Sequence, residues 1–146
     1  MSEENKAVVR RLFEEAWNQG NLAVVDELFA PDYVGHIPPE ILNGPEAFKQ
    51  FVKEYRTVFP DIHFTIEDLV AEGDKVVGRW TCRGTHKGEL QGIPATGVQV
   101  TSTGIHVSRI AGGKIVEAWS NWDAMGVMQQ LSAASESGQA KGTAAG

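Results

Sequence analysis

Cysteine is almost absent from the sequence, since Cys82 is the only one among 146 residues. No disulfide can therefore form within the chain, and a reducing compartment is compatible with it. The four histidines, at positions 36, 63, 86 and 106, show neither a His-x-His nor a His-x3-His spacing. Metal sites built from local sequence place their ligands at such short intervals. We expect no metal site.

Long apolar runs and clusters of basic residues are also missing. The chain carries 13 Lys and Arg against 19 Asp and Glu, a formal charge of −6, with no basic run that could follow a phosphate backbone. No stretch reaches 18 uninterrupted apolar residues, and the first twenty residues hold seven charges where a signal peptide has an apolar core. We therefore expect a cytoplasmic protein that binds neither nucleic acid nor a membrane.

Helical periodicity dominates the first sixty residues. Apolar side chains recur at intervals of three and four over residues 3–19, and Gly20 is typical of the end of such a helix. A short second helix follows Asn21, a favourable N-cap residue, and stops at Pro31. A third helix starts at Pro45. It carries the most aromatic stripe of the chain, formed by Phe48, Phe51, Tyr55 and Phe59.

After Ile62 the apolar period changes from 3.6 toward 2, which indicates strands. Turn signals at Gly73-Asp74 and Gly112-Gly113 predict hairpins. We place strands at 62–72, 75–87, 98–111 and 114–122, a short edge strand at 33–37 followed by a loop to residue 43, a loop at 88–97 and a helix after Asp123.

The length suits one domain, which we place at residues 1–131. Residues 132–146 contain no large apolar side chain, so the composition predicts a disordered tail. Three helices followed by a curved, mostly antiparallel sheet predict an α+β fold. A sheet that curls around the helices makes a cone with a pocket inside.

Alternation along the last strand places Trp119, Asn121 and Asp123 on one face and Trp122 on the other. On strand 75–87, Arg79 faces away from Trp80 by the same rule. Periodicity alone does not say which face is inward. The mixed faces fit a sheet with one side lining a partly polar cavity and the other meeting solvent or a second subunit.

Four segments of the second half form an ordered set: RWTCRGTHKG (79–88), GIPATG (92–97), GIHV (104–107) and GKIVEAWSNWD (113–123). This set resembles the SnoaL-like polyketide cyclase family, often called ester cyclases, over about residues 5–131. The resemblance implies a cone-shaped α+β protein of the nuclear-transport-factor-2-like (NTF2-like) superfamily. By position, it also implies that Asp123 is the catalytic acid/base and that His106 is a pocket histidine.

Limonene-epoxide hydrolases of the same superfamily use an Arg-x-Asp pair where this chain has Arg79-Trp80-Thr81. The missing carboxylate counts against that activity. By analogy only, the same comparison suggests that the face carrying Arg79 is the inward one.

The chemistry implied by the resemblance is an aldol-type ring closure without a cofactor. A base removes a proton from a carbon between carbonyls, and an acid then protonates the new alkoxide. A carboxylate in apolar surroundings has a raised pKa and can do both in turn. Asp123 between a strand and a helix is, alternatively, an N-cap with a lowered pKa.

The other candidate residues also have two interpretations. His106 is either a pocket donor or a hydrogen-bonded core histidine, and Arg79 is either a pocket residue or an ion-pair partner of Glu117. We expect the substrate, a hydrophobic carbonyl compound, to meet Arg79, Trp119, Asn121, Tyr33, Phe51, Tyr55 and Trp17. A homodimer through the outer sheet face is expected. Alternatives are a binding protein without chemistry, and an isomerase or hydrolase using the same pocket.

Overall fold

The computed structural model describes the backbone of residues 2–145 and the side chains of residues 2–134. Its helices are α1 (Ser2–Arg11), the π-helix η1 (Leu12–Asn18), α2 (Ala23–Leu28), α3 (Pro45–Val58) and α4 (Ala124–Ala145). Its strands are β1 (Phe29–Ile37), β2 (Glu40–Asn43), β3 (His63–Glu72), β4 (Lys75–Thr85), β5 (Gln99–Ala111) and β6 (Lys114–Trp122). Within the described residues, no helix has the length and apolar character needed to cross a membrane.

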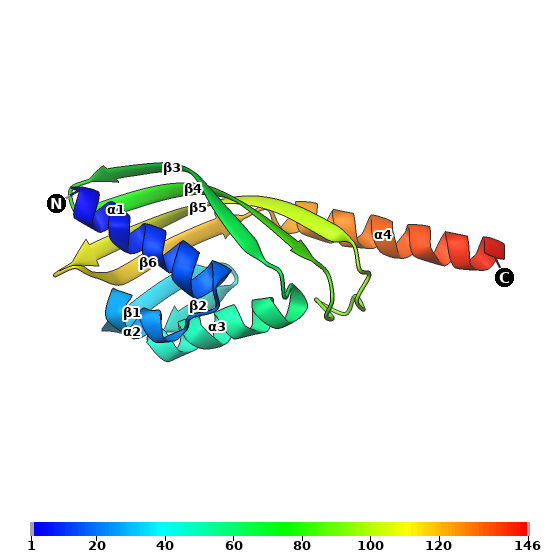
Figure 1. Ribbon diagram of the computed structural model, residues 1–146, viewed down its shortest axis with the longest axis horizontal. Helices are drawn as coiled ribbons and strands as arrows, with labels where there is room; N and C mark the ends of the chain where they lie inside the picture. The colour runs from blue at the N-terminus through cyan, green and yellow to red at the C-terminus, as the bar shows by residue number, and fades with distance from the viewer. Residues whose placement is uncertain (1, 146) are drawn as a thin grey trace.

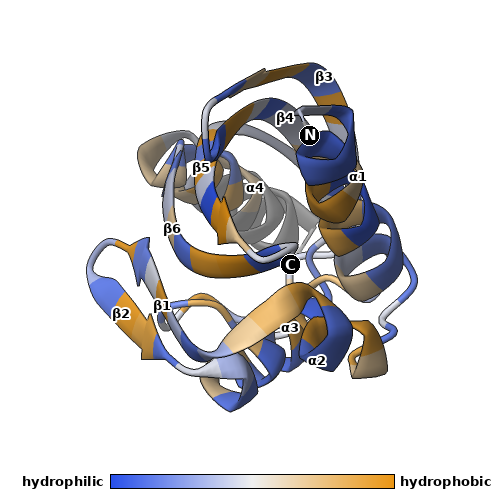
Figure 2. Cartoon of the chain, turned by 90° about the vertical axis from the view of Figure 1, so that its left-hand side faces the viewer, coloured by the Kyte–Doolittle hydropathy of each residue, from blue (hydrophilic) through white to orange (hydrophobic). Residues whose placement is uncertain are grey.

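All six strands belong to one sheet with the order β2-β1-β6-β5-β4-β3. β1 runs parallel to β6, and the other neighbouring strands are antiparallel. The sheet is open, with β2 and β3 at its edges (Figure 1). In the end-on view of Figure 2 it curls around α1 and α3. The architecture is the predicted α+β cone, with the helices held in the concave side of the sheet.

The N-terminal helices follow the predicted pattern with two differences. The first helix continues as a π-helix from Leu12 to Asn18, which turns its large apolar side chains, Phe13 and Trp17 among them, into the core. π-Helical turns occur frequently at functional sites. Asn21 does not cap α2, because the capping position is Leu22 and no side-chain bond is made there. The Asn21 N–H instead donates to the carbonyl of Glu15 at 2.9 Å.

The strands from β3 to β6 and helix α3 confirm the predicted elements to within two residues. The predictions for residues 29–43 were wrong in part. β1 begins at Phe29 and lies inside the sheet, between β2 and β6, and residues 40–43 form β2 where a loop was expected. The two prolines, Pro38 and Pro39, occupy the turn between these strands and remove no ladder donor from either.

α4 runs from Ala124 to Ala145 and extends away from the body of the molecule in Figure 1. The helix thus continues through the segment for which composition predicts disorder. Alanine, glutamine and lysine are good helix formers even where no core is available. Val127 and Leu131 on its first turns are buried against the sheet. The boundary of the folded domain at residue 131 and the disordered tail after it both stay predictions.

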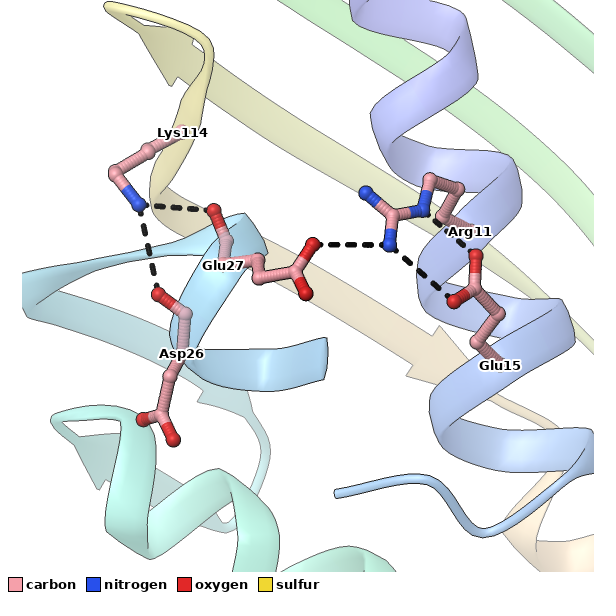
Figure 3. A network of polar contacts seen from close by, with 5 residues as sticks. All are labelled: Arg11, Glu15, Asp26, Glu27 and Lys114. Carbon is pink, nitrogen blue, oxygen red and sulfur yellow. Dashed lines mark hydrogen bonds and ion pairs between the residues drawn. The ribbon is translucent and has the colours of Figure 1, made fainter. Parts of the chain in front are cut away.

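A polar network ties the helices together at the end of the cone opposite α4 (Figure 3). Arg11 donates to Glu15 at 2.6 Å and to Glu27 of α2 at 3.0 Å. These contacts raise the pKa of Arg11, and the pKa of Glu15 is lowered by its bond to Arg11. Lys114 at the start of β6 donates to the carbonyl of Glu27 at 2.8 Å, where a cation suits the helix C-terminus. The network orients α2 against the sheet.

Candidate active site

The concave side of the sheet and the helices enclose an apolar cavity of about 100 Å³. The helices contribute a continuous aromatic wall, with Trp17 at its centre. The ring of Trp17 lies 6.1 Å from Phe48 and 6.0 Å from Phe51, edge to face in both cases. Such arrangements are favourable beyond the area that they bury. The helical wall is therefore mostly aromatic.

The sheet forms the opposite wall. The lining residues of β4, β5 and β6 are even-numbered: Trp80, Cys82 and Gly84 of β4, Val100, Ser102 and His106 of β5, and Ala118, Ser120 and Trp122 of β6. Phe64 of β3 and Tyr33 and Ile37 of β1 also line the cavity. The alternation predicted from the sequence is confirmed, and the structure decides which face is inward. Trp122 faces the cavity, whereas Trp119 and Arg79 lie on the outer face.

His106 is the titratable base on this wall. Its side chain is 6 % exposed, and its ring meets that of Phe13 edge to face at 5.5 Å. Burial lowers the pKa of His106 to about 4, because the protonated ring would lose its hydration. The imidazole is thus neutral at pH 7. It is then about as basic as a carboxylate in water.

Two serines hold the His106 ring from either side. Nδ1 lies 2.8 Å from Oγ of Ser120, and Nε2 lies 2.5 Å from Oγ of Ser108. Ser120 lines the cavity, whereas Ser108 is fully buried behind the ring. Nδ1 is therefore the nitrogen on the cavity side. Sequence reasoning missed both serines, although the inward alternation that includes Trp122 also includes Ser120.

Other polar groups on the wall remain protonated. Burial raises the pKa of Tyr33 and of Tyr55, so both phenols stay O–H donors. The Cys82 thiol is likewise desolvated, with a pKa raised to about 12. A thiolate nucleophile is consequently unavailable near neutral pH. Within residues 2–134, no carboxylate lines the cavity and no cluster of three His, Cys, Asp or Glu side chains could hold a metal ion.

Of the two interpretations of Asp123, the structure shows the N-cap, and the catalytic role stays a prediction. Its side chain is exposed, and Oδ1 accepts the N–H of Gly126 at 2.9 Å. This is the geometry of an N-cap, which satisfies an amide at the start of α4. The alternation of β6 would not aim Asp123 inward either, because it groups Asp123 with Trp119 and Asn121 on the outer face, and the strand itself ends at Trp122.

The analogy that aimed Arg79 inward was wrong. Arg79 is exposed and donates to Asp68 at 2.7 Å, not to Glu117. Glu117 instead accepts from Arg109 at 3.2 Å and pairs with His36 at 2.8 Å. Trp119 and Asn121 lie on the outer face with them, because the residues that line the cavity from β6 are the even-numbered ones. None of these three predicted substrate contacts, Arg79, Trp119 and Asn121, reaches the cavity.

Four other predicted contacts, Trp17, Tyr33, Phe51 and Tyr55, do line the cavity together with His106. Trp17, Phe51 and Tyr55 belong to helix stripes that had to face the core in any fold of this type, so their inward direction followed from the sequence, whereas Tyr33 is on β1. Their part in substrate binding stays a prediction.

Gly104 leaves room for the indole ring of Trp80, which lines the cavity. It lies opposite Trp80 in the β4–β5 pairing, and a Cβ at position 104 would overlap Cζ2 of that indole. In Gly104→Ala the ring must move toward the cavity. We expect a loss of about 1–3 kcal/mol in the free energy of unfolding, measured by urea denaturation.

The control for this substitution is Gly78→Ala on β4, where the nearest atom to the new Cβ is Cδ1 of the Leu69 side chain at 3.3 Å. Gly78, like Gly104, has no positive φ, so the control adds a methyl group to a strand without a clash against a ring. A Gly104→Ala variant as stable as the wild type would show that Trp80 does not rest on Gly104.

The family model for the SnoaL-like polyketide cyclases matches residues 7–131. The chain belongs to the SnoaL-like polyketide cyclase family. Among characterised proteins it is 34% identical over 119 residues to nogalonic acid methyl ester cyclase of Streptomyces nogalater, covering 80% of this chain and 89% of that one. Aklanonic acid methyl ester cyclase DnrD of Streptomyces peucetius is 33% identical over 130 residues, covering 85% and 88%.

Solved structures of SnoaL-like proteins share this architecture. A candidate polyketide cyclase from Acidithiobacillus ferrooxidans superposes with a TM-score of 0.82 at 34% identity, over 90% of this chain and 96% of that one. The IdmH protein of Streptomyces antibioticus gives a TM-score of 0.78 at 33% identity, over 88% and 98%. The NTF2-like cone expected from the sequence motifs is confirmed.

Proposed function

We propose that the protein is a cofactor-independent cyclase-type enzyme that transfers protons on a hydrophobic carbonyl compound, and that His106 carries the proton. The observation that supports this assignment is a neutral, enclosed imidazole on the wall of an otherwise apolar cavity. The relatives are named as cyclases of methyl esters. The same class of compound is the first to test here.

The proposed reaction uses His106 twice. Nδ1 removes a proton from a carbon between two carbonyls once Ser120 turns its hydroxyl from the ring to the substrate. The enolate attacks a second carbonyl and forms the new carbon–carbon bond. The imidazolium then returns its proton to the alkoxide, so that no proton is gained or lost. Tyr33 and Tyr55, kept protonated by burial, are the donors available to the enolate oxygen.

The cavity volume limits what enters. Pockets that hold whole drug-sized ligands measure roughly 300–1,000 Å³, whereas this one measures about 100 Å³. A dry cavity of about 150 Å³ holds one benzene molecule, so this smaller cavity admits at most a single ring. We therefore propose that the reacting ring of the substrate occupies the cavity and that the remainder extends past its rim.

Turnover is tested by incubating the purified protein with nogalonic acid methyl ester or aklanonic acid methyl ester and following the cyclised product by mass spectrometry coupled to chromatography. Product formation without added metal or cofactor supports the proposal. Binding of either compound without product over many hours supports a second function, storage or transport of such a molecule. The absence of a carboxylate on the cavity wall within residues 2–134 favours that alternative.

We also propose that the protein forms a homodimer through the outer face of the sheet. One cross-strand row crosses all six strands, and each neighbouring pair in it is in register. Its members are Val70, Val77, Val107, Trp119, His36 and Ile41. Val70 is 61% and Ile41 62% exposed, and an exposed apolar row of this length is typical of an interface. The cytoplasmic location stays a prediction from the sequence.

The dimer is tested by Val77→Glu, which places a charge in the row on β4, beside the edge strand β3. We expect light scattering after size exclusion to give a dimer for the wild type and a monomer for the variant, because an unpaired buried charge opposes association. Met125→Glu is the control, since Met125 is 72% exposed on α4, away from the sheet. A monomeric wild type, or a Val77→Glu variant that remains dimeric, contradicts this interface.

A further inference from the structure

Ser102 of β5 carries a hydroxyl on the cavity wall that the proposed reaction does not use. The residue is 9 % exposed and lines the cavity. A serine side chain consists of one carbon and one hydroxyl, so a serine that lines a cavity brings its Oγ to the cavity surface. Most of the surrounding wall is apolar. A hydroxyl in such surroundings is unfavourable unless it is hydrogen-bonded.

The protein gives this hydroxyl only a weak partner. Oγ of Ser102 donates to the carbonyl of Thr103 at 3.5 Å, whereas an O–H···O hydrogen bond normally measures about 2.5–3.0 Å. The same carbonyl already accepts the N–H of Asp123 at 3.0 Å. The Ser102 hydroxyl therefore keeps most of its capacity to donate, and an acceptor in the cavity would satisfy it.

The backbone around Ser102 is held in place from two sides. In the pairing of β4 with β5, Ser102 lies opposite Cys82, which also lines the cavity. On the other side, Gln130 of α4 donates to the Thr101 carbonyl at 2.8 Å and accepts the Thr101 N–H at 3.0 Å. A donor that is fixed in this way before binding loses little conformational freedom when a ligand arrives.

The charge of the wall limits which group Ser102 can bind. Within residues 2–134, no Lys, Arg, Asp or Glu lines the cavity. Cys82 stays a thiol, because burial raises its pKa to about 12, and His106 is neutral at pH 7. An ionised ligand group would find no counter-ion here, so the acceptor that fits is the oxygen of a ketone, an ester or an alcohol.

Ser102 and His106 lie at different positions along the cavity. Both line it from β5, and their separation by four residues corresponds to about 14 Å of strand. Gly104 lies between them, next to the indole of Trp80. One ring does not reach across this distance, so the two side chains contact different parts of an elongated molecule. A hydrogen bond at Ser102 therefore determines which end of the molecule meets His106.

We propose that the Ser102 hydroxyl is a binding donor that takes a neutral carbonyl, ester or hydroxyl oxygen of the bound molecule, on the part that lies away from His106. The proposal rests on the proposed function in one respect, namely that the cavity admits a carbonyl compound. It adds a second polar contact, which orients the molecule and takes no part in the proton transfer. The ligand oxygen supplies the close acceptor that the Thr103 carbonyl does not provide.

Two probes of nearly identical shape test this contact: acetophenone, which has a carbonyl acceptor, and α-methylstyrene, in which a CH₂ group replaces the oxygen. The carbonyl stretching frequency of ¹³C-labelled acetophenone is measured in the wild type and in Ser102→Ala, and both probes are titrated into each protein. In the wild type we expect a frequency below that of the ketone in an alkane, because a hydrogen bond weakens the carbonyl bond. In Ser102→Ala the frequency should rise toward the alkane value, and the affinity for acetophenone should fall about 5–10-fold. The affinity for α-methylstyrene should hold.

Thr103→Val is the matched control, because it also removes one hydroxyl from β5, but at an exposed residue. It should bind acetophenone as the wild type does, with an unchanged carbonyl frequency. If Ser102→Ala does not fold, a nuclear Overhauser contact in the wild type between the acetyl methyl group and Hβ of Ser102 decides the matter. The absence of that contact, a carbonyl frequency that is the same in the wild type and in Ser102→Ala, or an equal loss of affinity for both probes would each overturn the proposal and leave the proposed reaction intact. If neither probe binds the wild type, the Ser102 contact and the carbonyl-binding cavity both fail.

Discussion

Replacing His106 with Gln lowers the rate of cyclisation by about 10²–10⁴-fold, the range that general acid–base groups contribute. Glutamine can keep hydrogen bonds to Ser108 and Ser120, which hold the native ring at 2.5 and 2.8 Å, but it cannot accept and return a proton. The variant should therefore bind the methyl ester with little change in affinity. The measurement is kcat from product formation, with binding followed separately by fluorescence of the cavity tryptophans.

Asp123→Asn is the matched comparison. Asparagine caps helices about as well as aspartate, so the bond to the Gly126 N–H survives while the carboxylate is gone. We expect the rate of this variant to stay within a few-fold of the wild type. If Asp123→Asn abolishes turnover and His106→Gln does not, the carboxylate is the proton carrier. The family-based prediction for Asp123 would then be correct, and the exposed conformation of its side chain would have to change on substrate binding.

Acidification should destabilise the protein through His106 before most carboxylates titrate. The pKa of His106 in the folded protein is lowered from 6.5 to about 4. Between these two values the unfolded chain binds a proton at His106 and the folded protein does not. Stability is therefore complete above pH 6.5 and falls as the pH drops from about 6.5 to 4. At about 1.4 kcal/mol for each pH unit, the loss approaches 3 kcal/mol. Urea denaturation at a series of pH values measures it.

The His106→Gln variant separates this effect from that of the carboxylates. Glu117 has its pKa lowered by His36 and Arg109, and the pKa of Asp61 is lowered by its bonds to Thr85. Both stabilise the fold at neutral pH and lose that contribution as the pH falls below about 4.5. They act alike in the wild type and in the variant. The difference in the free energy of unfolding between the wild type and His106→Gln should therefore change between pH 6.5 and 4. A difference that stays constant over this range would contradict a desolvated His106.

The helices and long strands could be predicted from the sequence because their periods are dictated by burial. The aromatic stripe of α3 and the alternation of β4 and β6 both required one apolar face. The sequence did not predict which face of β6 lines the cavity, because Trp119 and Trp122 are equally apolar and lie on opposite faces. The contact between Trp80 and Gly104 could be found only in the structure, and it lies on the face of the sheet that lines the cavity.

Residues at the ends of elements were the hardest to place. Asp123 lies one residue beyond the end of β6, where its carboxylate accepts the amide N–H of Gly126 and does not line the cavity. β2 was not predicted because four residues after two prolines carry no period of their own. Ser108 and Ser120 gave no signal, because a serine between apolar residues indicates no function until the histidine that it contacts is located.

The central claim is that His106 is a neutral base enclosed by an apolar cavity, and its own titration tests that claim most directly. Two-dimensional ¹H–¹⁵N spectra of histidine-labelled protein, recorded from pH 8 down to the acid limit of the fold, report the protonation and tautomer of each ring. We predict that His106 titrates with a pKa of about 4 and remains neutral at pH 6. A His106 that takes up its proton near its ordinary value of about 6.5 would contradict the claim.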